Sequence, residues 1–257
     1  MLRAVYEEEF NGFIFREHEE VRKLDYLILA LPDVGLVGAI AGLHIIRELD
    51  MRDVVGIDHY AAFPPVVVIH KGDPKYPMRI HAREGVGVLI TDVPIAPPAI
   101  PAFSQAIVSY ARVKGVKMLI SITGMGIPNR IEVQKPTLYY LANDRESEIE
   151  GGRIGAKTVE QGILVGPYAL ILKEAARRGL SNLVLMVESF VDLPDPEAAA
   201  VAVEAVSKIT GLKVDTVKLV EEAEKIKVRL KELMRETKSV MAKMGKTYEY
   251  RPPLLYT

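Results

Sequence analysis

Two glycine-rich segments are the places where this sequence could bind a phosphate or another small ligand. Residues 31–42 carry glycines in the spacing G-x-x-G-x-x-x-G, where a predicted strand leads into a helix. This spacing matches neither the dinucleotide-binding fingerprint nor a P-loop, and no Lys-Ser or Lys-Thr pair follows it. Gly38, Ala39 and Gly42 share one face of the predicted helix, so we interpret them as positions of close packing between helix and sheet.

The second segment, from Gly124 to Arg130, directly follows a predicted central strand. Ligands in α/β folds usually bind at the carboxyl ends of strands, so this loop is placed for binding. Apart from Asn129 and Arg130, no polar group that could act as a nucleophile or general base lies near it in the sequence. We interpret the segment as a tight structural turn and leave open whether it binds a ligand.

The remaining residues with reactive side chains lack the spacing of a catalytic or metal site. The serines show no G-x-S-x-G elbow, and cysteine is absent. The histidines show neither HExxH nor H-x-H spacing and no carboxylates at ligand intervals. We therefore predict no catalytic residues, no metal and no cofactor, and expect a protein that is not an enzyme. The histidines are His18, His44, His59, His70 and His81.

Composition excludes further classes of partner. Lysine and arginine number 33 against 34 aspartates and glutamates, so no overall basic charge attracts nucleic acid. The first residues lack the basic and apolar regions of a secretory signal, and no apolar run reaches the ~18 residues of a membrane span. The absence of cysteine suits a reducing cytosol or a hot environment. We expect a cytoplasmic, thermostable protein with neither nucleic acid nor membrane as partner.

Residues 1–214 predict a three-layer α/β body. Short runs rich in Val, Ile and Leu alternate with helical patterns, which implies a sheet covered on both faces. The turn-like residues 71–74 predict antiparallel pairing of residues 66–70 with 78–81, and therefore a mixed sheet. Asp195 and Pro196 mark a helix start, and Gly211 marks its end. The predicted strands are 26–31, 54–59, 66–70, 86–91, 118–122 and 183–187, and the predicted helices are 35–49, 100–114, 161–178 and 196–210.

Residues 215–244 contain neither glycine nor proline and predict one long helix of ~45 Å, at 1.5 Å per residue. Its apolar residues are spaced alternately by four and three, as in a coiled-coil seam. The apolar face is wide, and half of the d positions of the heptad carry β-branched residues. Both features favour a bundle of more than two helices, so we expect a homo-oligomer and favour a tetramer. The alternative is an amphipathic helix lying on its own domain. The residues assigned to oligomerisation are Leu219, Ile226, Leu230, Leu233 and Val240.

Residues 245–257 predict an extended docking tail. Pro252 and Pro253 favour a stiff polyproline II segment. Leu255, Tyr256 and Thr257 then supply an apolar anchor, an amphipathic aromatic ring and a carboxylate that a lysine could capture. A frayed terminus is the alternative interpretation.

Several short motifs, in this order, resemble those of the archaeal homologues of proteasome assembly chaperones. The resemblance extends over most of the chain. The motifs are Pro-Asp-Val-Gly-Leu-Val-Gly at 32–38, Gly-Met-Gly-Ile-Pro at 124–128, Gly-Ile-Leu-Val-Gly at 162–166, Asp-Pro-Glu-Ala-Ala at 195–199 and Gly-Leu-Lys-Val-Asp at 211–215.

The resemblance implies a fold like that of nucleoside phosphorylases, without their activity, and an ATP-independent role in assembling or opening proteasomes. Leu255, Tyr256 and Thr257 match the hydrophobic-Tyr-any motif that docks between α-subunits of the proteasome core particle. Leu255 would fill an apolar groove, Tyr256 would pack and hydrogen-bond, and the carboxylate of Thr257 would pair with a lysine. The competing hypothesis is an enzyme or sensor that binds nucleosides or nucleotides through the Gly124–Arg130 loop and a histidine.

Overall fold

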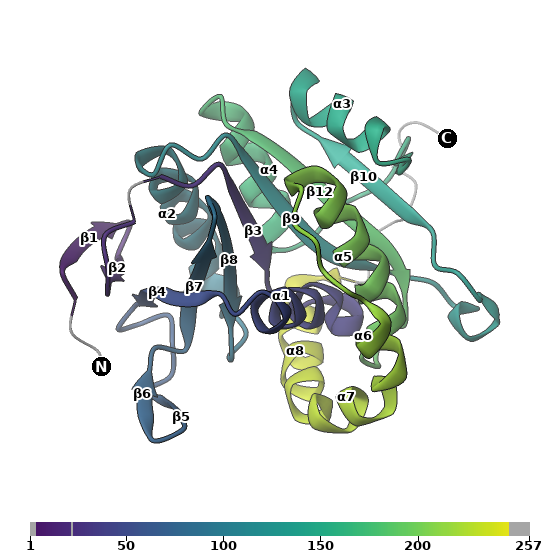
Figure 1. Ribbon diagram of the computed structural model, residues 1–257, viewed down its shortest axis with the longest axis horizontal. Helices are drawn as coiled ribbons and strands as arrows, with labels where there is room; N and C mark the ends of the chain where they lie inside the picture. The colour runs from purple at the N-terminus through teal and green to yellow at the C-terminus, as the bar shows by residue number, and fades with distance from the viewer. Residues whose placement is uncertain (1–3, 22, 247–257) are drawn as a thin grey trace.

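A ten-stranded mixed sheet forms the centre of the computed structural model, which describes residues 4–21 and 23–246 (Figure 1). Its strands are β1 (Tyr6–Phe10), β2 (Phe13–Glu17), β3 (Tyr26–Ala30), β4 (Arg52–Asp58), β7 (Met78–Arg83), β8 (Val86–Thr91), β9 (Met118–Gly126), β10 (Leu138–Ala142), β11 (Lys157–Thr158) and β12 (Ser181–Ser189). They lie in the order β1-β2-β4-β7-β8-β3-β9-β12-β10-β11. The four central strands β8, β3, β9 and β12 are parallel, as their continuously apolar sequences predict.

Helices cover both faces of this sheet (Figure 1). Helices α1 (Val37–Glu48) and α5 (Pro196–Thr210) pack together on one face, and α2 (Ile100–Val113) and α4 (Pro167–Arg177) pack together on the other. The alternation along β3 shows the reason, because Ile28 belongs to the core under α1 and α5 whereas Leu27 and Leu29 belong to the core under α2 and α4. The predicted three-layer architecture and mixed sheet are confirmed. The remaining helix of the body, α3 (Arg145–Arg153), packs beside β10 and β12.

Helix α5 has the limits that its sequence predicts. The carboxylate of Asp195 accepts a hydrogen bond of 3.0 Å from the backbone amide of Ala198, and Pro196 occupies the first helical position. Gly211 ends the helix with φ of 77°, in the left-handed region that glycine adopts without strain.

Two local predictions of the sheet are wrong. Residues 66–70 do not pair with residues 78–81: β5 (Val68–His70) pairs instead with β6 (Asp73–Lys75) in a separate hairpin that projects from the body (Figure 1). β7 pairs with β4 and β8. β9 continues to Gly126, beyond the predicted end at Ile122, because its pairing with β12 extends to Ser189.

The prediction of one continuous helix over residues 215–244 is also wrong. The segment forms α6 (Val217–Glu221), α7 (Ala223–Arg229) and α8 (Lys231–Met244), which bend at Glu222 and Leu230 (Figure 1). The bends let the apolar stripe follow the curved surface of the body, where a straight helix would leave it.

No described helix of the protein is long and apolar enough to cross a membrane.

The predicted oligomerisation residues face the body of their own chain. Leu219 is 2 % exposed and belongs to the core under α1 and α5, and Ile226, Leu230 and Leu233 pack against the same core. Val240 is partly buried in a small apolar pocket beside Leu31. The alternative, an amphipathic segment lying on its own domain, therefore describes these residues in the monomer. Whether the segment also joins copies of the chain stays a proposal.

Candidate functional site

The carboxyl ends of β3 and β9 form the position at which open α/β sheets usually bind ligands. From β3 the chain continues to β4, which lies on the β8 side of the sheet. From β9 it continues to β10, which lies on the β12 side. The connections therefore diverge between the neighbouring strands β3 and β9. A crevice normally opens at such a topological switch point. In this protein the position is filled by side chains, because charged and polar residues from four separate parts of the sequence meet here; we call this filled position the crevice.

Asp33, which follows β3, is the first charged residue of this site. Its carboxylate accepts a hydrogen bond of 2.8 Å from the hydroxyl of Thr123 in β9. The ammonium group of Lys246, just beyond α8, lies 2.9 Å from the same oxygen, Oδ2. Asp33 and Lys246 are 2 % and 6 % exposed, so the pair is withdrawn from solvent. The end of α8 thus closes the crevice with a side chain of the protein itself.

Arg130 and Asp195 form a second buried pair next to the crevice. Arg130 donates to the two carboxylate oxygens of Asp195 at 2.7 and 3.0 Å, and to Glu197 at 2.9 Å. Its guanidinium also lies 5.1 Å from the ring centre of Phe190. Burial by itself lowers the pKa of Arg130, but the hydrogen bonds to Asp195 and Glu197 more than compensate and the pKa is raised. The arginine is therefore held charged and fixed.

The glycines near the crevice serve close packing. A β-carbon at Gly38 would lie 2.5 Å from the carbonyl oxygen of Ile122, and one at Gly42 would lie 2.4 Å from the β-carbon of Ala30. A β-carbon at Gly124 would lie 2.5 Å from the carbonyl oxygen of Val34. The packing interpretation of residues 31–42 is confirmed. Gly124 and Gly126 belong to β9, so the prediction that they form a turn is wrong.

His44 and His59 each contact backbone groups. The Nε2 atom of His44 lies 2.5 Å from the carbonyl oxygen of Asp215, and Nδ1 of His59 accepts hydrogen bonds from the amides of Ala61 and Ala62. Within the described ranges, no group of three histidines and carboxylates could hold a metal ion.

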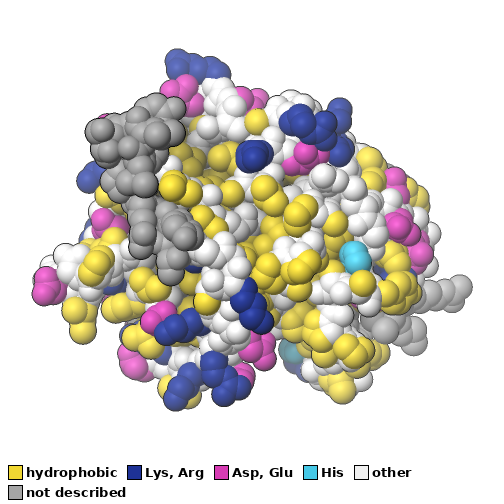
Figure 2. All heavy atoms as spheres, turned by 180° about the vertical axis from the view of Figure 1, so that it is seen from behind, with side chains coloured by type: hydrophobic (Ala, Val, Ile, Leu, Met, Phe, Trp, Pro, Cys, Tyr) yellow, Lys and Arg dark blue, Asp and Glu magenta, His cyan; other side chains and the backbone are white. Residues whose placement is uncertain are grey.

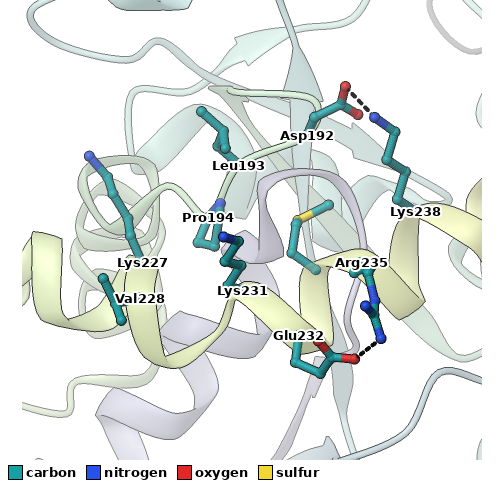
Figure 3. A pocket seen from close by; sticks show the side chains of 10 residues that line it. Asp192, Leu193, Pro194, Lys227, Val228, Lys231, Glu232, Arg235 and Lys238 are labelled. Atoms are coloured by element: carbon teal, nitrogen blue, oxygen red, sulfur yellow. Dashed lines mark hydrogen bonds and ion pairs between the residues drawn. The ribbon is translucent and has the colours of Figure 1, made fainter.

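A groove between α7, α8 and the loop before α5 is a second candidate site, suited to a protein partner (Figure 3). It measures about 470 Å³, and its apolar lining residues are Leu193, Pro194, Val228 and Met234. Lysines and an arginine also line it, and Lys238 pairs with Asp192 at 2.7 Å. Val228 is 75 % exposed. On the back of the molecule, hydrophobic side chains also gather near the middle of the face (Figure 2). Exposed apolar surface of this kind is typical of interaction sites.

The sequence prediction placed function in the tail and missed the crevice. Leu255, Tyr256 and Thr257 lie outside the described residues. The link between Asp33 and Lys246 was not predicted, although a charged residue three positions after the apolar strand β3 could have drawn attention to Asp33.

A model of the PAC2 family matches residues 27–234, from β3 into α8. The crystal structure of Pyrococcus furiosus PbaA, an archaeal homolog of proteasome-assembly chaperone, is similar with a TM-score of 0.81 and 30 % identity, over 88 % of this chain and 98 % of that one. An uncharacterized protein of Methanocaldococcus jannaschii is 29 % identical over 222 residues, 86 % of this chain and 90 % of its own.

Pyrococcus furiosus PbaB, an archaeal proteasome activator, shares the fold. Its TM-score is 0.72 at 21 % identity, over 87 % of this chain and 99 % of that one. The sequence motifs alone favour PbaB within the family, whereas identity and TM-score are both higher for PbaA. The likeness to nucleoside phosphorylases is not tested by these comparisons and stays a prediction.

Proposed function

The chain belongs to the PAC2 family, and on that premise we propose that it is a proteasome assembly chaperone or activator that acts by docking and not by catalysis. The observation that carries the proposal is the similarity to PbaA, at 30 % identity over nearly the whole of both chains. The buried pairs at the switch point support it as well, because the side chains that could meet a substrate there are engaged with one another.

The docking element of this proposal is the C-terminal tail. Leu255 would enter an apolar pocket between α-subunits, Tyr256 would pack and hydrogen-bond there, and the carboxylate after Thr257 would pair with a lysine. This tail is anchored near its start, since Lys246 is held against Asp33.

We further propose that the protein self-associates, with a tetramer favoured. The residues assigned to oligomerisation pack on the body of their own chain. Other apolar side chains of residues 215–244 would therefore make the contact between copies. Val217, Val220 and Val228 are 56 %, 52 % and 75 % exposed, and Leu193 lines the groove together with Val228. Several tails on one oligomer would bind a ring of α-subunits through avidity, which can exceed the affinity of a single tail by ~10²-fold or more.

Capture of archaeal core particles by the immobilised protein tests the proposal. The intact chain is compared with a variant lacking residues 255–257 and with Ile131→Ala, which alters an exposed apolar residue in another part of the molecule. We expect capture by the intact chain and by Ile131→Ala, and its loss on truncation. Equal capture by the truncated chain would refute docking through the motif. Absence of capture by every variant, with a rise in melting temperature on adding purine nucleosides, would favour the enzyme or sensor hypothesis.

A further inference from the structure

The carboxylate of Asp33 is a buried charge with unused capacity to accept hydrogen bonds. Oδ2 receives the hydroxyl of Thr123 and the ammonium group of Lys246. Oδ1 is buried and has no hydrogen-bond partner among the described residues. An isolated buried carboxylate is strongly unfavourable, so the site requires a cation.

The chemistry around Asp33 selects a primary ammonium group. Such a group has three donors and no acceptor, which suits a site made of carboxylate and hydroxyl oxygens. A quaternary cation such as tetramethylammonium has no N–H group to donate, so it cannot replace the ammonium group in this pattern of contacts.

We propose that the crevice at the ends of β3 and β9 is a binding site for a primary ammonium group, which Lys246 occupies in cis. The occupied site fixes the end of α8 on the body. Thr237 and Met241 on α8 are buried as the helix approaches the crevice, so the ion pair completes a packed contact. The site thereby fixes the point at which the proposed docking tail is attached, and this consequence rests on the proposed docking function.

Chemical rescue tests the site without any proteasome. Lys246→Ala removes the ammonium group and its stem, and we expect its melting temperature to fall by about 5 to 10 °C, as for loss of one partner of a buried pair. Ethylammonium chloride should then raise the melting temperature of the variant in a saturable manner and recover at least half of the loss. Tetramethylammonium chloride at equal ionic strength should not, and the wild type should respond equally to both salts.

The double variant Asp33→Asn/Lys246→Ala is the matched control, because it keeps the vacated space but lacks the carboxylate. The melting temperature of this double variant should be the same in ethylammonium and in tetramethylammonium chloride. Lys246→Met, which retains an apolar stem, replaces Lys246→Ala if that variant does not fold. A melting temperature of the single variant equal to that of the wild type, or an equal response to both salts, overturns the proposal.

Hydrogen exchange tests the anchoring of α8 separately. The amides of residues 241–246 should exchange at least tenfold faster in Lys246→Ala and return towards the wild-type rate with ethylammonium. Unchanged exchange would show that the site does not hold the helix end. If these results hold while the wild type fails to capture core particles, the docking function is wrong and the ammonium site stands.

Discussion

Arg130 and Asp195 join the connection after β9 to the start of α5 through two buried hydrogen bonds of 2.7 and 3.0 Å. Asp195 also caps α5 through the amide of Ala198. One carboxylate thus fixes a helix start, and one arginine fixes the segment that follows the central strand. The pair thus holds the segment after β9 against the start of α5.

We expect Arg130→Met to lower the free energy of unfolding by about 3 to 5 kcal/mol, because it leaves the Asp195 carboxylate buried without its cation. Glu197→Gln is the control, since this partner of Arg130 is 51 % exposed and should contribute less than ~1 kcal/mol. Urea denaturation of both variants measures the difference. Equal effects would show that the pair contributes no more than a surface salt bridge.

The proposed docking motif predicts a large effect from one aromatic side chain. Tyr256→Ala removes packing and a hydroxyl, at roughly 2 kcal/mol or more per tail if the residue is an interface hot spot, and the loss multiplies over the tails of an oligomer. Binding to core particles in surface plasmon resonance should collapse.

A glycine added after Thr257 separates the contribution of the carboxylate, because it displaces the charge and keeps each side chain. We expect weaker binding than for the natural chain. Native affinity for both this variant and Tyr256→Ala would contradict docking through the tail.

The buried side and the exposed side of residues 215–244 should respond differently to an introduced glutamate. Leu230→Glu with Leu233→Glu places carboxylates against the core under α1 and α5, so the melting temperature should fall with a loss of several kcal/mol. Val228→Glu alters an exposed residue at the groove and should change stability by no more than ~0.5 kcal/mol.

Light scattering on the same two variants tests self-association. Val228→Glu should reduce the mass of the assembly while leaving the fold intact. An unchanged mass would exclude this groove as the contact between copies.

His81 predicts a pH dependence of stability. Burial lowers its pKa from the ordinary value of 6.5, and the nearby Asp53 offsets this only in part. Between the lowered pKa and about 6.5, the unfolded chain binds more protons than the folded one. The contribution of neutral His81 to the free energy of unfolding is therefore fully present above about pH 6.5 and is lost as the pH falls below it. His81→Gln should flatten this decline, as measured by urea midpoints between about pH 5 and 7.5. His70→Gln, at an exposed histidine, should keep the wild-type slope. An unaltered slope in His81→Gln would assign the effect to other groups.

The sequence alone determined the central strands, the layers and the helix that begins at Asp195. These features depend on local signals: the continuous apolar run of residues 86–91 predicts a strand buried on both faces, and Asp195 caps a helix through an amide three residues away. The apolar stripe of residues 215–244 was equally visible, because periodicity shows which face of a helix is apolar.

Tertiary structure decided what covers that stripe and where the charges go. Periodicity does not distinguish the surface of a second copy from the curved surface of the same chain, so the bends at Glu222 and Leu230 were not predictable from spacing. The pair of Asp33 and Lys246 joins residues 213 positions apart. Local spacing carries no information about a contact at that separation, because it depends on how the ordered strands and the segment 215–244 are placed in space.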